Sequence, residues 1–124
     1  MRLSPAEETT RQALLARARE AGLAGIDSST RAVAGADARL AEAVVRVLLA
    51  EGRLRRVGET VVDAGALDNL KVEVRRRWPP GTRLDVAGFK DLTGLSRKFV
   101  IPLLEYLDRE RVTRRTGNDR LVLM

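Results

Sequence analysis

The sequence predicts a mainly helical α+β protein in which one order of elements occurs twice. Three helical segments precede a short β-hairpin in the first half, and three more precede a hairpin in the second half. The spacing of apolar residues changes where each hairpin begins. Three helices followed by a hairpin is the order of a winged helix. We therefore expect two tandem winged-helix modules, over residues 1–63 and 64–124, with a connector of small residues at Ala64–Ala66.

The first module opens with a helix whose two ends are both marked in the sequence. Ser4 can cap this helix, Pro5 suits its first position, and Glu7 completes a capping box. We expect the helix to run to Ala21 and to end at Gly22. Its apolar stripe is formed by Leu14, Leu15, Ala18 and Ala21.

Two further helices and a hairpin complete the first module. Capping residues and glycines mark where each segment begins and ends. The expected segments are a short helix from Asp27–Ser29 to Ala34 before Gly35, a helix over Ala38–Glu51 between Asp37 and Gly52, and strands over Leu54–Val57 and Thr60–Asp63 around Gly58-Glu59.

The second module shows the same order with one extra extended piece. Its expected segments are a helix over Leu67–Trp78 stopped by Pro79-Pro80-Gly81, an extended piece at Arg83–Asp85, a helix over Val86–Thr93 ended by Gly94, a helix capped by Ser96 that runs to about Glu110, and strands over Val112–Thr116 and Arg120–Met124 around Gly117-Asn118-Asp119. At an offset of 58 residues, Leu49–Arg56 aligns with Leu107–Arg114, more by pattern than by identity. The chain therefore looks like a duplication.

The composition excludes most catalytic and metal chemistry. The chain has no cysteine and no histidine, so it can form no disulfide, no thiolate or imidazole catalyst and no ordinary zinc site. It has no GxxxxGK[ST] phosphate loop, and its 3% of aromatic residues cannot form an extended platform for stacking bases. We expect a protein that is not an enzyme and has no metal and no cofactor of its own.

The sequence also lacks membrane and export signals. Its apolar runs are far shorter than the roughly 20 residues that cross a bilayer. Residues Met1–Glu20 carry several charges in place of the apolar core of a signal peptide. We therefore expect a cytoplasmic protein without a membrane partner.

The positive charge is concentrated in the second module. Residues 1–63 hold ten arginines against nine acidic residues, whereas residues 64–124 hold thirteen lysines and arginines against eight acidic residues. A surface of this sign binds nucleic acid by neutralising phosphates and releasing counterions. The alternative is a solvated surface that only keeps the protein soluble.

The first turn of the last helix is the main binding candidate. In a helix-turn-helix the second helix of the pair reads the nucleic acid, and here its first turn is Ser96-Arg97-Lys98. The Ser96 hydroxyl and the amides at this positive helix end suit a phosphate, to which Arg97 and Lys98 add two cations. Lys90, one turn earlier, could close the patch. Alternatively, Ser96 only caps the helix and the two cations are solvated, although cations at a helix N-terminus are unfavourable without a partner.

The hairpin of the second module is the other binding candidate. Because side chains alternate along a strand, Arg114 and Arg115 point to opposite faces, and at most one of them shares a face with Arg120. Asn118 could hydrogen-bond a base edge, although asparagine is also an ordinary turn residue. The candidates on and beside the hairpin are Arg111, Arg114, Arg115, Asn118 and Arg120.

Three short sequence motifs of the second module, taken together, are specific enough to indicate a protein family. They are Leu95-Ser96-Arg97-Lys98, Ile101-Pro102-Leu103-Leu104-Glu105-Tyr106 and Arg111-Val112-Thr113-Arg114-Arg115. With the surrounding segments Phe89–Asp108 and Val112–Arg115, they make this module resemble the C-terminal end of the bacterial selenocysteine-specific elongation factors, the SelB family. The first module is similar to that family only as a winged helix.

The resemblance implies a role in the incorporation of selenocysteine. Such factors carry a GTPase-containing body followed by tandem winged helices, and the last winged helix grips the selenocysteine insertion hairpin of the messenger RNA. It implies that this chain is the two-module C-terminal piece, acts as a monomer, and holds the RNA loop against Lys90, Ser96, Arg97, Lys98 and the hairpin arginines. GTP, the ribosome and selenocysteyl-tRNA are then expected only through the full-length factor.

Without the resemblance, the residues leave two other functions open. Winged helices mostly bind duplex DNA, and a DNA-binding transcription regulator would normally need a symmetric dimer to read two half-sites. A protein-interaction module would instead show an exposed apolar patch over the second reading helix.

Overall fold

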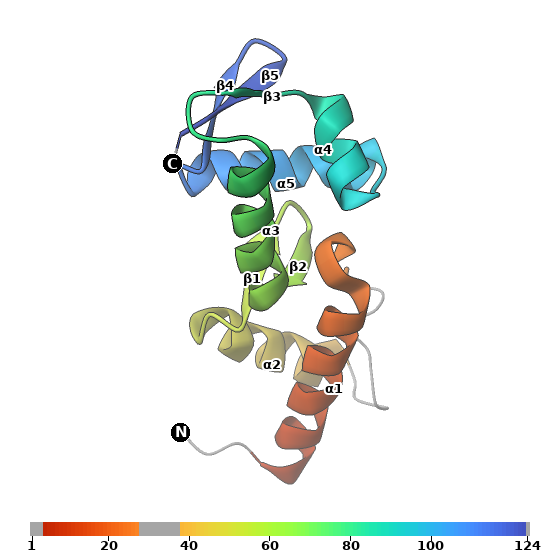
Figure 1. Cartoon of the computed structure of the whole chain (residues 1–124). Coiled ribbons are helices and arrows are strands. Elements are labelled where there is room, and N and C mark those ends of the chain that lie inside the picture. Colours follow the sequence, from red (N-terminus) through yellow and green to blue (C-terminus); the bar gives the residue numbers. More distant parts are fainter. Residues whose placement is uncertain (1–3, 28–37, 124) are drawn as a thin grey trace. The chain divides into compact units, whose positions relative to one another are not determined.

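The computed structural model describes residues 4–27 and 38–123, which form two compact units, Met1–Ala66 and Leu67–Met124 (Figure 1). The first unit contains α1 (Pro5–Ala21), the 3-10 helix η1 (Gly22–Ala24), α2 (Ala38–Ala50), β1 (Leu54–Val57) and β2 (Thr60–Asp63). The second contains most of α3 (Ala64–Arg77), then β3 (Arg83–Leu84), α4 (Val86–Thr93), α5 (Arg97–Arg109), β4 (Thr113–Thr116) and β5 (Asp119–Val122).

Helix α1 has the predicted ends. The Ser4 hydroxyl accepts a hydrogen bond from the Glu7 amide at 3.2 Å, and the Glu7 carboxylate accepts one from the Ser4 amide at 3.1 Å. This reciprocal capping box satisfies two amide donors that the helix itself cannot pair. Leu14, Leu15 and Ala18 are buried as expected, and they pack against the buried face of α2.

The rest of the first unit closes around this core. The hairpin β1–β2 has the predicted strands and turn, with Leu54 opposite Asp63 and Val57 opposite Thr60. Ile26 adds an isolated antiparallel bridge to Val61, which the sequence did not predict. The short helix expected from Asp27–Ser29 to Ala34, the glycine that closes it and the cap at Asp37 lie wholly or mostly outside the described residues.

Helix α3 begins at Ala64, three residues earlier than predicted, so Ala64–Ala66 are helical and not a connector, although the two units do divide directly after Ala66. The Asp63 carboxylate accepts a hydrogen bond from the Ala66 amide at 3.1 Å. An aspartate in this position stabilises a helix start. Ala64–Ala66 therefore form the first turn of α3, which ends at Arg77.

Helices α4 and α5 keep their predicted starts. Asp85 caps α4 by accepting a hydrogen bond from the Gly88 amide at 3.0 Å, and Gly94 ends it in the left-handed conformation. Ser96 occupies the N-cap position of α5, but its side chain makes no capping hydrogen bond. The buried face of α5 is formed by Val100, Leu103, Leu104, Tyr106 and Leu107.

The sheet of the second unit has three strands, in the order β3-β5-β4. The sequence predicted β3 as an extended piece but not its antiparallel pairing with β5. In the hairpin, Thr116 pairs with Asp119, so Asp119 belongs to β5 and only Gly117 and Asn118 form the turn. The predicted three-residue turn is therefore one residue too long. A two-residue turn with a leading glycine at positive φ suits the twist of an antiparallel hairpin.

The two units repeat at an offset of 59 residues, not 58. Helices α2 and α5 each have 13 residues, and β1 and β2 follow α2 at the spacing at which β4 and β5 follow α5. The offset of 58 had placed Gly52 opposite Glu110. The residue that shares the left-handed conformation of Gly52 (φ 76°) is Arg111 (φ 60°). Sequence alignment missed this because a left-handed residue is usually glycine and here is arginine.

Candidate nucleic-acid interface

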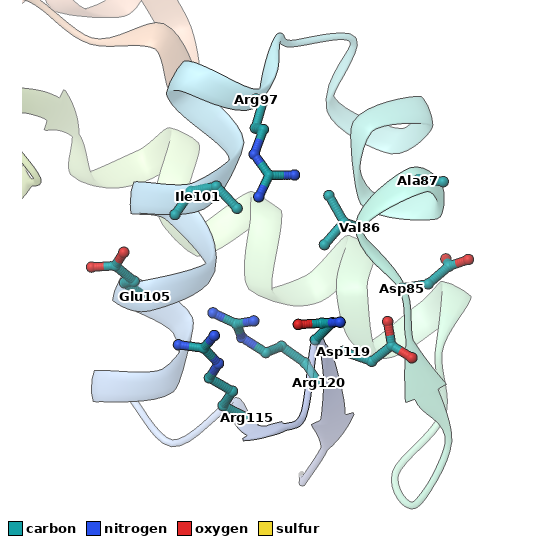
Figure 2. Close-up of a pocket in the computed structure, with 10 residues that line it drawn as sticks. Asp85, Val86, Ala87, Arg97, Ile101, Glu105, Arg115, Asp119 and Arg120 are labelled. Atoms are coloured by element: carbon teal, nitrogen blue, oxygen red, sulfur yellow. The ribbon is translucent and has the colours of Figure 1, made fainter.

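A hollow of about 550 Å³ lies on the second unit, bordered by the start of α4, one face of α5 and the hairpin β4–β5 (Figure 2). Four of the nine predicted site residues line it, namely Arg97, Arg115, Asn118 and Arg120. The other lining residues are Asp85, Val86, Ala87, Ile101, Glu105 and Asp119.

Helix α5 supplies one wall of the hollow. Arg97, Ile101 and Glu105 are spaced four residues apart, so they lie on one face of the helix. Figure 2 shows the Arg97 guanidinium pointing into the hollow, with the half-buried Ile101 beside it and the Glu105 carboxylate directed away. The four-residue spacing was the sequence signal that could have added Ile101 and Glu105 to the candidate site.

The hairpin supplies the opposite wall. Arg115 on β4 is the direct partner of Arg120 on β5, so their side chains lie on the same face. Arg114 is opposite Leu121, and its side chain points to the other face of the hairpin. The alternation of the strand therefore places Arg115, and not Arg114, beside Arg120.

Arg115 and Arg120 are both held through their Nε atoms. The Arg115 Nε donates to the Gly117 carbonyl at 3.1 Å, across the turn. The Arg120 Nε donates to Asp108 Oδ2 at 3.1 Å, and Thr113 Oγ1 donates to Asp108 Oδ1 at 2.6 Å. The terminal nitrogens of both guanidinium groups remain on the side of the hollow.

Arg120 differs from the exposed cation that the sequence suggested. Its side chain is only 5% exposed, and it forms an ion pair with Asp108. The Asp108 carboxylate accepts hydrogen bonds from both Arg120 and Thr113, so it joins the last helix to the hairpin. Helical periodicity could not predict this pair, because the position of Arg120 depends on the register of β5 against β3 and β4.

The acidic residues around the hollow already have partners or point elsewhere. Asp85 caps α4, and Asp119 lies 3.8 Å from the guanidinium of Arg83. Arg97, Arg115 and Arg120 therefore offer three guanidinium groups to this hollow beside the Asn118 amide, while Asp85 and Asp119 are engaged with other groups. Guanidinium groups suit the oxygens of phosphates.

The other five predicted site residues are exposed but do not line the hollow. Lys98 Nζ lies 5.6 Å from the centre of the Phe99 ring. Ser96 lies beside Arg97 at the start of α5, and Arg114 faces the opposite side of the hairpin. Arg114 therefore lies apart from this hollow, which corrects its place among the candidates, whereas Ser96 and Lys98, with Lys90 and Arg111, remain predictions for contacts around the rim.

Other kinds of site find little support in the described part of the chain. Over residues 4–27 and 38–123 there is no group of three or more acidic side chains that could hold a metal ion. None of the helices in those ranges is long and apolar enough to cross a membrane. The large apolar side chain that is exposed there, Val72 at 51%, lies on α3 and not on the reading helix α5.

Comparison with known proteins points to one family. A family model for the winged helix of elongation factor SelB matches residues 81–122. A selenocysteine-specific elongation factor from Desulfomicrobium baculatum is 41% identical over 78 residues, which are 62% of this chain and 12% of that protein. The chain thus spans a small part of the length of this curated relative.

Two solved structures share the fold of the whole chain. The mRNA-binding domain of SelB from E. coli, solved in complex with SECIS RNA, has a TM-score of 0.72 and 23% identity, over 98% of this chain and all of that one. A bacterial selenocysteine-specific elongation factor, EF-Sec, has a TM-score of 0.76 and 24% identity, over 98% of this chain and 20% of that one. Residues 81–122 are therefore similar to the winged helix of elongation factor SelB, within a chain whose fold these two structures share over 98% of its length.

Proposed function

We propose that this chain binds a messenger RNA hairpin as the RNA-binding part of a selenocysteine-specific elongation factor. The observation that carries the proposal is the position of Arg97, Arg115 and Arg120 around one hollow beside Asn118. This hollow is built from the segment that the SelB winged-helix family model covers. A solved relative with the same fold is an mRNA-binding domain in complex with SECIS RNA.

The chemistry of the hollow fits the loop of a folded RNA. The deep groove of an A-form stem is closed to side chains, so sequence is read where loops and bulges expose bases. Guanidinium groups can hold the phosphates of such a loop in a fixed place. The Asn118 amide offers both a donor and an acceptor for one base edge. Lys90, Ser96, Lys98 and Arg111 would then add phosphate contacts around the rim.

The rest of the activity would belong to a larger protein. We infer that GTP binding, the ribosome and selenocysteyl-tRNA involve the body of the full-length factor, which works in the cytoplasm. The present chain would contribute a monomeric tether without a cofactor of its own. Its task would be to recruit the factor to one kind of messenger RNA.

A titration with three nucleic acids tests this proposal. Fluorescence anisotropy would compare a selenocysteine insertion hairpin, a hairpin of scrambled loop sequence and duplex DNA. We expect the first to bind much more tightly than the other two. Equal affinity for the two hairpins would contradict specific recognition, and tighter binding to duplex DNA would favour a transcription regulator.

The variant Arg97→Ala tests the role of the hollow. It should weaken binding of the insertion hairpin by about tenfold or more, because a charge-assisted hydrogen bond to phosphate is lost. It should also flatten the plot of log K against log salt by about 0.7–0.9 for each phosphate contact removed. Arg19→Ala is the matched control, because it removes an exposed arginine from α1 in the other unit. An equal loss in both variants would mean that only net charge matters.

A further inference from the structure

The two units differ in one buried cluster. At the offset of 59, Leu49, Leu54 and Val61 of the first unit correspond to Asp108, Thr113 and Arg120 of the second. Leu54 and Val61 are 1% and 0% exposed, and Leu49 packs against the same core. Thr113 and Arg120 are nearly as buried, at 1% and 4%. An apolar cluster has thus been replaced by a polar one in the same place of the same fold.

The fold itself does not require the polar cluster. Burying a charged guanidinium is costly even when it is paired, and apolar residues of similar size often give equal or greater stability. The first unit builds its hairpin against its helix with the apolar set. The same fold therefore forms without an ion pair in the first unit, which makes the pair of Asp108 and Arg120 a candidate for a role beyond folding.

The hydrogen bonds of the cluster fix one guanidinium group. Asp108 uses one carboxylate oxygen for Thr113 Oγ1, at 2.6 Å, and the other for Arg120 Nε, at 3.1 Å. Thr113 thereby orients the carboxylate, and the carboxylate orients the guanidinium. Figure 2 shows the far end of Arg120 in the hollow, on the same face as its strand partner Arg115. Its terminal N–H groups are donors whose position is set before any ligand arrives.

The lining of the hollow indicates the class of ligand. It contains three arginines and no aromatic ring on which a base could stack. Of its three acidic residues, Asp85 caps α4, Asp119 faces Arg83 and Glu105 is directed away. At the offset of 59, the first unit has Ala38, Arg56 and Val61 where the second has Arg97, Arg115 and Arg120. Only one of the three arginine positions is thus conserved between the units. This arrangement favours a phosphate group in the second unit and disfavours one in the first.

We propose that Asp108 and Thr113 are positioning residues that hold Arg120 as a fixed donor for a phosphate of the RNA loop. They do not touch the RNA themselves. Because the first unit has the apolar cluster in their place, phosphate recognition of this kind is confined to the second unit. This inference rests on the proposed function, since the phosphate is that of the bound hairpin.

The decisive variant copies the first unit into the second. The triple variant Asp108→Leu, Thr113→Leu and Arg120→Val removes one negative and one positive charge, so its formal net charge is unchanged. We expect it to melt at the same temperature as the natural chain or higher. We also expect its affinity for the insertion hairpin to fall by about ten- to a hundredfold, with a flatter salt dependence. Wild-type affinity and slope in a folded triple variant would overturn the inference.

A second measurement keeps the test valid if the triple variant fails to fold. In ¹H–¹⁵N spectra of the RNA-free chain, the Arg120 Nε–H should give its own slowly exchanging signal, which Asp108→Asn should shift and broaden. Asp108→Asn should also weaken hairpin binding while Arg75→Ala, an exposed arginine of α3, leaves it nearly unchanged. An Arg120 signal that exchanges like those of exposed arginines would overturn the inference.

The controls separate this inference from the proposed function. If the natural chain does not prefer the insertion hairpin over the scrambled one, the proposed function fails, and the phosphate role of Arg120 fails with it. If the natural chain prefers that hairpin and Arg97→Ala weakens it, but the triple variant binds normally, only the inference fails.

Discussion

Arg111 is a residue whose side chain and backbone conformation do not suit each other. It has a positive φ of 60°, as Gly52 has in the first unit at 76°. Among the described residues it is the only non-glycine residue with positive φ. A side chain in the left-handed region costs about 1–2 kcal/mol, because its Cβ crowds the backbone. The second unit therefore contains a local strain that the first unit avoids.

The variant Arg111→Gly should relieve this strain. We expect it to raise the free energy of unfolding by about 0.5–1 kcal/mol, since glycine adopts positive φ freely but loses more chain entropy on folding. Urea denaturation followed by circular dichroism measures this. The reciprocal control is Gly52→Ala, which should destabilise the chain through conformation alone, because no atom lies within 4 Å of the added Cβ. No change in either variant would contradict the argument.

The candidate site shows what the sequence can indicate and what it cannot. Arg97 was predicted because it lies in the first turn of a helix, and that turn is marked by local residues. The pairing of Asp108 with Arg120 was not predicted, because it joins a helix to a strand whose register is set by long-range pairing. Strand alternation limited the choice between Arg114 and Arg115, but only the register identified Arg115.

Helix ends were predicted better than strand pairings, for the same physical reason. The capping box of Ser4 and Glu7 and the left-handed Gly94 each act within four residues, so short strings reveal them. The start of α3 was missed because its cap, Asp63, is also the last residue of β2. The pairing of β3 with β5 was missed because the partners are far apart in the sequence.

The variant Asp63→Ala tests the cap of α3. It should lower the free energy of unfolding by about 1 kcal/mol, because the amide of Ala66 loses its acceptor. Thermal unfolding monitored at a helical wavelength measures the effect. The control is Asp91→Ala, which removes an exposed carboxylate from α4. If both variants melt alike, the cap contributes nothing beyond its charge.

One ion pair recurs in both units but with a different cation. Arg11 contacts Glu51 at 2.6 Å, and Lys71 contacts Glu110 at 2.7 Å, each joining the first helix of its unit to the end of the reading helix. Burial alone would lower the pKa of Lys71. The hydrogen bond and the negative charge of Glu110, with a contribution from Tyr106, raise this pKa above its ordinary value of 10.5.

The variant Lys71→Arg should therefore change the stability only in alkali. A lysine whose pKa is raised by folding stabilises the chain below its unfolded pKa, and this contribution is lost as the pH rises through its folded pKa. Arginine remains charged in this range. We expect equal stability at neutral pH and a growing advantage of the variant above pH 10.5. Parallel unfolding curves for the two proteins throughout this range would show that the ion pair does not contribute.

The whole chain consists of two units that each have a core of their own. The first is built on Leu14, Val44 and Leu48, and the second on Phe89, Leu103 and Leu107, all fully buried. The sequence indicated this duplication because helix caps and turn residues recur at nearly constant spacing. The cluster around Val61 is apolar and the corresponding cluster around Arg120 is polar, which suggests that the two units have diverged in function while keeping one fold.

A fragment over residues 62–124 should therefore bind the RNA hairpin without the first unit. It retains Asp63, so α3 keeps its cap, and it contains every residue that lines the hollow. We expect its dissociation constant to lie within about threefold of that of the whole chain, a difference of roughly 0.6 kcal/mol. A fragment over residues 1–66 is the control, and it should not distinguish the insertion hairpin from a scrambled one. If the 62–124 fragment folds by circular dichroism but binds more than about tenfold more weakly, the first unit must supply contacts of its own, because a loss of 1.4 kcal/mol is too large for a passive spacer.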